Sequence, residues 1–288
     1  MSEPSKNTSP ANDVSAGTLK DRFIYGGIGL LAIFLALWAG IALIIPSLVY
    51  ILWVATNELS EIFSRRNINL NKPFLLTSGI ITLLLSIPDL HSLHPAIPWR
   101  EIGLGLVVLI AFAIALSGQL DVGDVAFNLM AFLYVPWMLG YFILLRYSPD
   151  GHLGIITLSL PLLATFSTDV GAYFVGKSFG RHKLAPSISP NKTIEGSIGG
   201  LLTAFLSLMI YTWFIQGVFP FGRWELMVFS LLISVAAQLG DLTESMIKRY
   251  CGVKDSGTFL PGHGGILDRL DSLIFSIPLT YYLLVIFT

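Results

Sequence analysis

The sequence predicts an all-α, polytopic membrane protein, and three observations support this fold class. Of its 288 residues, 54% are hydrophobic and only 12% are charged. The mean hydropathy is +0.74. The apolar residues also gather in long runs, and about 20 apolar residues are needed for a helix to cross a bilayer. A soluble domain of this length does not need so much apolar surface, so we expect the bilayer to be a partner and no nucleic acid to be bound.

The elements are expected in a simple order along the chain. Residues 1–19 are rich in Ser, Pro, Asn and Asp and lack aromatic residues, which predicts a disordered tail. Residues 20–288 are expected to form a single integral-membrane catalytic domain. About nine transmembrane helices are predicted within it, at 23–45, 47–64, 74–88, 101–118, 126–146, 154–176, 196–217, 226–247 and 272–288. The first run is long and lacks an A-x-A cleavage site, so it is expected to remain as a span.

The basic residues predict an orientation in the membrane. Alternating the nine spans places the N-terminus on the same side as four loops, 65–73, 119–125, 177–195 and 248–271. The other side then holds only Arg100, Arg146 and Arg223 of the 17 Lys and Arg residues. Basic residues collect on the cytoplasmic side of membrane proteins. We therefore expect a cytoplasmic N-terminus and a cytoplasmic active site.

The run at 226–247 changes character near its predicted cytoplasmic end. If the helix continues, five polar side chains share one face at spacings of three, three, one and three. They are Gln238, Asp241, Glu244, Ser245 and Lys248. An amide, two carboxylates, a hydroxyl and an ammonium in this order suit a divalent ion and its bound phosphate. The alternative is a solvated helix end with an ordinary ion pair, which is disfavoured because unpaired charge below the interface is costly.

The final run opens with Asp268 and Asp271, one helical turn apart. Carboxylates at a helix N-terminus are favoured by the helix dipole in any protein, so alone they say little. Here they follow a glycine-rich segment that includes His263, Gly264 and Gly265. Glycine permits positive φ and a close backbone approach, so peptide N–H groups can face phosphate oxygens ahead of a helix. His263 could donate a hydrogen bond to a phosphate, although a loop histidine is commonly just solvated.

A second polar constellation lies at 165–200. Asp169 stands in an apolar run, and an ionisable group in a span is a functional hypothesis by default; a neutralised or paired structural carboxyl is the alternative. Ser189 and Lys192 precede the helix that opens near Gly196, so Lys192 and the helix N-terminus form a candidate anion site. The segment is not a Walker A loop, because that motif is absent.

Other polar residues in the chain have simpler interpretations. Asp121 and Asp124 lie in a short loop without evident partners. Glu58 and Glu61, at the end of the second run, either line the cavity or lie outside it. Cys251 is the only cysteine, which excludes an internal disulfide and a multi-cysteine metal site; it is interpreted as a small packing residue.

The motifs together resemble the phosphatidate cytidylyltransferases, the CDP-diacylglycerol synthases, over roughly residues 165–288. The long motif is carried by Ser245, Lys248, Arg249, Lys254, Asp255, Ser256, Leu260, Pro261, Gly262, His263, Gly264, Gly265, Asp268, Arg269 and Asp271. Upstream motifs of the same family are matched at 169–176, 189–196 and 240–245. Before residue 165 the resemblance depends on span count and hydropathy.

The resemblance implies transfer of a cytidylyl group from CTP to phosphatidate, giving CDP-diacylglycerol and pyrophosphate, with Mg²⁺. A second cation, such as K⁺, is expected from the density of carboxylates. The resemblance also implies a homodimer and the inner membrane of a bacterial cell.

The roles that follow are assigned residue by residue. Asp241 and Asp268 are expected to be the principal metal ligands, with Glu244 and Asp271 close by. Contacts with CTP or pyrophosphate are expected from Lys248, Arg249, His263 and Arg269. Ser189 and Lys192 are candidates for the phosphatidate head group or the triphosphate, and Asp169, Gly264 and Gly265 for further substrate contacts. We expect Asp169 and Lys192 to complete the site formed by the last two helices.

Two other functions remain open from the sequence. A CTP-dependent kinase for polyprenol or phytol would share the membrane architecture, but it would need a base to activate an alcohol. A transporter or scaffold could also carry an intramembrane Asp and a charged loop. Transporters usually show inverted repeats and discontinuous helices, and no repeat is evident here.

Overall fold

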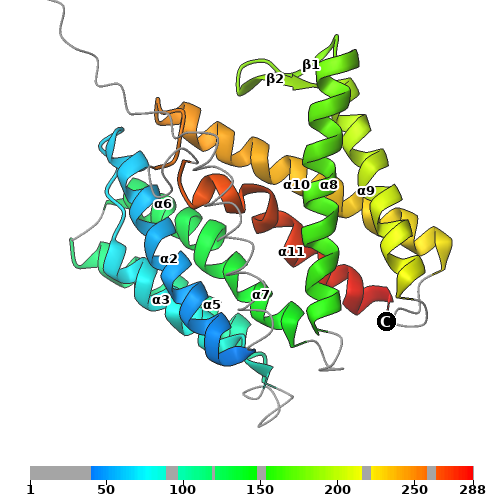
Figure 1. Ribbon diagram of the computed structural model, residues 1–288. Helices are drawn as coiled ribbons and strands as arrows, with labels where there is room; N and C mark the ends of the chain where they lie inside the picture. Colours follow the sequence, from blue (N-terminus) through cyan, green and yellow to red (C-terminus); the bar gives the residue numbers. More distant parts are fainter. Residues whose placement is uncertain are drawn as a thin grey trace, which may run out of the picture.

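The computed structural model describes residues 40–88, 97–118, 121–147, 154–215, 222–257 and 264–287 (Figure 1). The elements are α2 (Ile41–Ser64), α3 (Lys72–Leu85), α5 (Trp99–Leu116), α6 (Val122–Phe132), the π-helical turn η1 (Leu133–Trp137), α7 (Met138–Arg146), α8 (Gly154–Phe179), β1 (Lys183–Ala185), β2 (Ser189–Thr193), α9 (Ile194–Phe214), α10 (Arg223–Tyr250) and α11 (Leu267–Phe287). The predicted tail at 1–19 and most of the first predicted span lie outside the described residues.

Seven helical segments of the described chain are long and apolar enough to cross a membrane. They are α2, α5, the continuous segment Val122–Arg146, α8, α9, α10 and α11. Helix α3 is apolar but has only 14 residues. The predicted class, an all-α polytopic membrane protein, is confirmed. The number nine stays a prediction, because the first expected span is not described.

Two predicted boundaries, one on each side of Pro46, are wrong. We expected one run to end at residue 45 and the next to begin at 47, but α2 continues through Pro46. Proline lacks the N–H that would bond to the preceding turn, yet membrane helices tolerate it. The span 122–146 likewise contains Pro136, and there the helix widens into η1. A π-helical turn of this kind accommodates a disturbed hydrogen-bond ladder without ending the helix.

The segment expected as a loop at 177–195 contains a β-hairpin, so the all-α prediction missed one small sheet. Strands β1 and β2 are antiparallel, and Lys183 pairs with Thr193. The Glu195 carboxylate ties the hairpin to the first turn of α9, since its Oε2 accepts hydrogen bonds from the backbone N–H groups of Arg181 and His182 at 3.0 and 3.2 Å. Thr193 caps α9 by accepting a hydrogen bond from Gly196 N at 3.1 Å.

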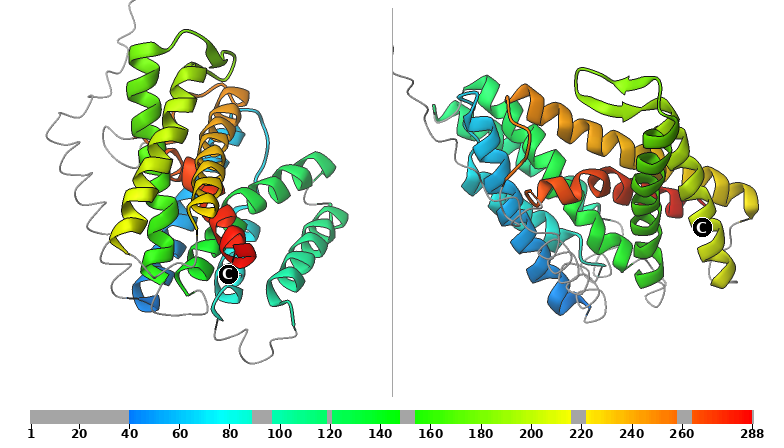
Figure 2. Two further views of the ribbon diagram at one scale, coloured as in Figure 1. Left: turned by 90° about the vertical axis from the view of Figure 1, so that its right-hand side faces the viewer. Right: turned by 45° about the horizontal axis from the view of Figure 1, so that its top comes forward.

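Glycines allow the closest helix contacts. Helix α8 packs along α9 (Figure 1), where a Cβ on Gly171 would overlap the side chain of Thr203. Helix α10 packs along α11 in both views of Figure 2, where a Cβ on Gly240 would overlap the carbonyl oxygen of Asp271. Small residues at helix interfaces let backbones approach closely inside a membrane. These two pairs hold most of the predicted site residues.

Described parts of the four loops predicted to be cytoplasmic, three of which are rich in Lys and Arg, meet at one end of the molecule, which we call the basic end. Arg66 Nε donates a hydrogen bond to the carbonyl oxygen of Tyr250 at 2.7 Å. Arg249 Nε donates to the carbonyl oxygen of Ile188 at 3.3 Å. Asn69 N donates to Asp124 Oδ1 at 3.4 Å. The hairpin also lies at this end (Figure 2).

Candidate active site

Helix α10 is continuous from Arg223 to Tyr250, so the polar face predicted from the sequence forms as one surface. The residues of this face make different contacts. Gln238 faces α9, where its Oε1 accepts a hydrogen bond from Ser197 Oγ and its Nε2 donates to the carbonyl oxygen of Ser197 at 3.3 Å. Ser245 Oγ lies 3.4 Å from Asp241 Oδ1. Gln238 therefore joins two helices, and Ser245 supports a carboxylate.

Lys248 joins α10 to α11 through two carboxylates. Its Nζ lies 2.6 Å from Asp268 Oδ1 and 3.2 Å from Glu244 Oε2. The side chains of Lys248, Asp268 and Glu244 are only 11%, 15% and 3% exposed. Among the described residues the Glu244 carboxylate has no hydrogen-bond partner apart from its ion pair with Lys248, so this ion pair is the main compensation for its burial. A buried carboxylate left in this condition favours a further cation.

Asp268 is held by residues that precede it in the chain. Its Oδ2 accepts hydrogen bonds from Ser256 N at 3.1 Å, Ser256 Oγ at 2.8 Å and Gly265 N at 2.8 Å. Gly264 has φ +80°, a left-handed conformation that glycine adopts at no steric cost. The glycine-rich segment was expected to turn its N–H groups towards phosphate. In this structure the N–H of Gly265 points at Asp268 and fixes its orientation.

Lys192 links the hairpin to α10, because its Nζ lies 2.6 Å from Asp241 Oδ2. The two side chains are 27% and 30% exposed, so they are accessible to a solute. Asp169 of α8 interacts electrostatically with Asp271, Asp241 and Lys192. The two polar constellations of the sequence thus meet in space. We call the following six side chains the carboxylate–lysine cluster: Lys192, Asp241, Glu244, Lys248, Asp268 and Asp271.

Some predicted residues have other contacts. Arg249 donates hydrogen bonds to the carbonyl oxygens of Ile188 at 3.3 Å and Val253 at 3.0 Å, so it braces the hairpin. Ser189 begins β2. The backbone N–H of Arg269 donates to the carbonyl oxygen of Ile266 at 3.1 Å. His263 lies outside the described residues.

Two residues near this cluster, Glu58 and Tyr134, were not predicted as site residues from the sequence. The Glu58 carboxylate accepts hydrogen bonds from Ile266 N at 2.8 Å and Leu267 N at 3.0 Å, at the start of α11. A carboxylate in an apolar run was the available signal, but Glu58 was considered together with the exposed Glu61. The hydroxyl of Tyr134 is buried and has no hydrogen-bond partner in the part of the chain that the structure describes, and it interacts electrostatically with Glu244 and other carboxylates of the cluster. Nothing in an aromatic-rich span distinguishes this tyrosine beforehand.

Cys251 agrees with its simple interpretation. The residue is 4% exposed, and burial raises the pKa of its thiol, while the charge of Arg66 acts in the opposite direction. A higher thiol pKa lowers the fraction of reactive thiolate. Asp121 is not without partners, since its Oδ1 accepts a hydrogen bond from Asp124 N at 2.7 Å and caps α6.

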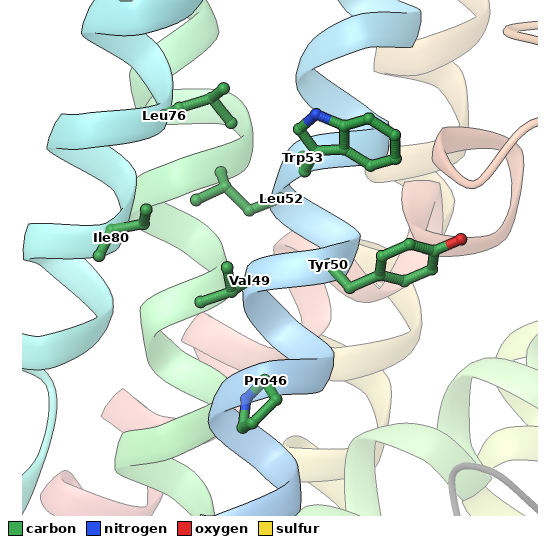
Figure 3. Close-up of a pocket in the computed structure, with 7 residues that line it drawn as sticks. All are labelled: Pro46, Val49, Tyr50, Leu52, Trp53, Leu76 and Ile80. Atoms are coloured by element: carbon green, nitrogen blue, oxygen red, sulfur yellow. The ribbon is translucent and has the colours of Figure 1, made fainter.

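An apolar cavity lies elsewhere, between α2 and α3 (Figure 3). Its volume is about 460 Å³. It is lined by Pro46, Val49, Tyr50, Leu52, Trp53, Leu76 and Ile80. No carboxylate or cation contributes to this lining, so the cavity supplies no polar chemistry.

The cluster fits a hard divalent cation in donor type, since Mg²⁺ prefers carboxylate oxygens and phosphate. The buried Glu244 carboxylate, whose one close partner among the described residues is the ammonium of Lys248, points to the same conclusion. Within the described ranges, however, no three His, Cys, Asp or Glu side chains are already arranged around one metal position. The ammonium groups of Lys192 and Lys248 instead stand 2.6 Å from Asp241 and Asp268. Positive charge is thus present at both carboxylates that were expected to bind metal.

Comparison with known proteins gives a family match that includes every residue of the cluster. Residues 20–287 match the model of a family described as the cytidylyltransferase family. The chain belongs to this family. Membership covers the N-terminal half as well, where the sequence offered only span count and hydropathy as signals.

Relatives with high similarity are bacterial members of the family. The phosphatidate cytidylyltransferase of Bacillus subtilis (strain 168) is 41% identical over 217 residues, which cover 73% of this chain and 79% of the relative. That of Staphylococcus aureus (strain COL) is 38% identical over 243 residues, covering 82% of this chain and 90% of the relative. That of Staphylococcus saprophyticus (strain ATCC 15305) is 38% identical over 224 residues, covering 76% and 83%.

Proposed function

We propose that this cytidylyltransferase transfers the cytidylyl group of CTP to phosphatidate and releases pyrophosphate, with CDP-diacylglycerol as the lipid product. The observation that carries the proposal is the carboxylate–lysine cluster, which two membrane helices and a hairpin assemble at the basic end. The relatives are named for phosphatidate, and an enzyme embedded in a bilayer has access to such a lipid. A transporter or scaffold is not favoured by membership of a transferase family.

The chemistry needs positioning and charge more than a strong base. A phosphate oxygen of phosphatidate, already ionised at neutral pH, attacks the α-phosphorus of CTP. The bond from that phosphorus to the bridging oxygen breaks, and its electron pair leaves with pyrophosphate. Two polyanions must be brought together, so catalysis depends on alignment and on cations around the transferred group. An alcohol nucleophile, as in a lipid kinase, would need a base in addition.

The residues divide this work between them. Asp241 and Asp268, with Glu244 and Asp271, would hold Mg²⁺, which when bound neutralises phosphate charge and aligns the nucleotide. The density of carboxylates also leaves a place for a second cation such as K⁺. Lys192 and Lys248 are held in the site by their ion pairs and can turn towards phosphate oxygens of CTP or phosphatidate. His263, Arg269 and Gly264 remain proposed substrate contacts beside them.

We also propose the finer points of location and assembly. The basic end would face the cytoplasm, in agreement with the distribution of Lys and Arg, and the protein would lie in the inner membrane of a bacterial cell. Pairing of two copies would follow the homodimer implied by the family resemblance. Cross-linking of the purified protein in micelles measures the copy number directly.

A product assay tests the proposed function. Purified protein in detergent micelles is incubated with phosphatidate, Mg²⁺ and CTP labelled on either the α- or the γ-phosphate. Label from the α-phosphate is expected in the lipid fraction. Label from the γ-phosphate in lipid would instead identify a kinase. If no CTP-dependent product forms and a solute crosses liposomes that contain the protein, a transporter would replace both.

A further inference from the structure

Glu58 connects the N-terminal half of the chain to the candidate site. It lies near the end of α2 and is 7% exposed. Its Oε1 accepts a hydrogen bond from Ile266 N at 2.8 Å, and its Oε2 accepts one from Leu267 N at 3.0 Å. The first backbone N–H groups of a helix have no partner within that helix. The carboxylate of α2 thus caps α11 from another part of the chain, where the helix dipole favours negative charge.

Glu58 also fills the space between two glycine-containing segments. A Cβ on Gly257 would lie 2.8 Å from Glu58 Oε1, and a Cβ on Gly265 would lie 2.5 Å from Glu58 Oε2. Real Cβ atoms do not approach other atoms so closely. The absence of a side chain at both positions lets the segments close around the carboxylate, so Glu58 sets how they lie relative to each other.

Ser256 extends this connection to the cluster. Its Oγ lies 3.3 Å from Glu58 Oε2 and 2.8 Å from Asp268 Oδ2. The backbone N–H of Ser256 donates to the same Asp268 oxygen at 3.1 Å. The hydroxyl therefore stands between the two carboxylates. A displacement of Glu58 would therefore shift Asp268, both through Ser256 and through the first turn of α11.

We propose that Glu58 is a positioning residue for Asp268 and, through the 2.6 Å ion pair, for Lys248. It touches no reacting group itself. Its role is to hold the start of α11 so that the Asp268 carboxylate keeps one orientation. This inference rests on the proposed function, because it assigns Glu58 a part in the same reaction.

Kinetics of Glu58→Gln test the proposal, with Glu61→Gln as the matched control. Glu61 is one turn further along α2 and is exposed. The amide can still accept one backbone hydrogen bond but presents N–H to the second donor. We expect kcat for cytidylyl transfer to fall about 10- to 100-fold, as for other partners that orient a ligating carboxylate. The KM for phosphatidate should stay close to wild type, while the thermal midpoint should fall moderately because a buried helix cap is lost. A kcat equal to that of the control would overturn the proposal.

A double-mutant cycle separates positioning from a general structural role. If Glu58 acts through Ser256, Glu58→Gln combined with Ser256→Ala should lower kcat little more than the more damaging single change. Independent roles would multiply their effects, and that result would remove Ser256 from the connection and leave only the contacts of Glu58 with Ile266 and Leu267. Should Glu58→Gln give no folded protein, Glu58→Asp provides the same cycle with the charge retained. The shorter carboxylate of Glu58→Asp reaches α11 less well. We therefore expect its kcat to lie between that of wild type and that of Ser256→Ala, and a kcat equal to wild type would contradict the need for this contact.

Amide hydrogen exchange distinguishes failure of this inference from failure of the proposed function. If wild-type protein made no CDP-diacylglycerol, the proposed function would fall while the contact of Glu58 could still be measured. Peptides containing Ile266 and Leu267 should exchange faster in Glu58→Gln than in Glu61→Gln. Equal exchange in the two variants would show that Glu58 does not hold the start of α11.

Discussion

Asp268 holds more of the site together than any other single side chain described above. One oxygen receives the ammonium of Lys248 at 2.6 Å, and the other accepts hydrogen bonds from Ser256 and Gly265. Its role is therefore both electrostatic and architectural. A change at this position affects a proposed metal ligand and the packing of α11 together.

Asp268→Asn should abolish turnover, because the amide cannot neutralise Lys248 or bind a divalent ion as a carboxylate does. The lysine would keep only Glu244, at 3.2 Å, as a counter-ion, and breaking a largely buried ion pair costs up to about 3–5 kcal/mol in the free energy of unfolding. The measurements are α-label transfer and chemical unfolding. Glu225→Gln, at the opposite end of α10, is the control. Near-wild-type turnover by folded Asp268→Asn would disprove the assignment, and the same holds for Asp241→Asn.

Lys248→Ala should mainly weaken binding of the triphosphate. The ammonium is held between Glu244 and Asp268, and an ammonium beside the proposed metal ligands can stabilise the charge of a phosphate. We expect a higher KM for CTP with a smaller change in KM for phosphatidate, measured by varying each substrate in turn. Lys183→Ala, on the exposed strand β1, is the control. An unchanged KM for CTP together with an unchanged kcat would count against this role.

At the residue scale the sequence predicted the members of the cluster but not their contacts. Spacing along one helix indicates which side chains share a face, so the α10 residues were grouped correctly. The spacing does not indicate which residue of another element each side chain contacts. Gln238 belongs to the same stripe as Asp241, yet it bonds to Ser197 of α9. Glu58 could not be assigned because its partners are backbone N–H groups about 200 positions later, and a backbone donor carries no sequence signal.

At the scale of elements, the contact between α10 and α11 decides whether the cluster forms. Gly240 allows this contact, since a Cβ there would overlap the carbonyl oxygen of Asp271. Asp241 and Asp271 flank the same crossing. The distance between the two helices and the distance between the carboxylates are therefore set together.

Gly240→Ala should push α10 away from α11, lower activity and lower the thermal midpoint. The added methyl group overpacks a close interface, which typically costs about 1–3 kcal/mol. Gly105→Ala is a matched control, because nothing lies within 4 Å of its added Cβ; alanine there should be neutral or slightly stabilising in a helix. Equal thermal midpoints for the two variants would mean that the helices can separate without cost.

The elements that were not predicted share one physical reason. Hydropathy identifies apolar runs, and the positions of α5, α8, α9, α10 and α11 follow from them. It does not report how a helix passes a proline, so the continuity of α2 through Pro46 was missed. It also does not report short polar strands. The hairpin is stabilised by Glu195 and by its position above α9, and these are tertiary contacts.

At the scale of the whole molecule, the basic end gives the strongest test of orientation. The chain has a single cysteine, Cys251, which Ala can replace. Lys183→Cys and Arg223→Cys then place single thiols on the hairpin and at the start of α10. A membrane-impermeant maleimide should label Lys183→Cys in inverted vesicles and Arg223→Cys in intact spheroplasts. The reverse pattern would contradict the cytoplasmic site, and labelling of both thiols from one side would contradict the span arrangement.

The order of synthesis gives the capping contact of Glu58 a consequence for biogenesis. Helix α2 enters the bilayer early, carrying a carboxylate whose partners at Ser256, Ile266 and Leu267 have not yet been translated. An ionisable side chain is costly within a membrane until it is paired. Until α11 has been made, the Glu58 carboxylate therefore lacks the contacts that it makes in the folded protein, and α2 reaches its final position only when α11 is in place.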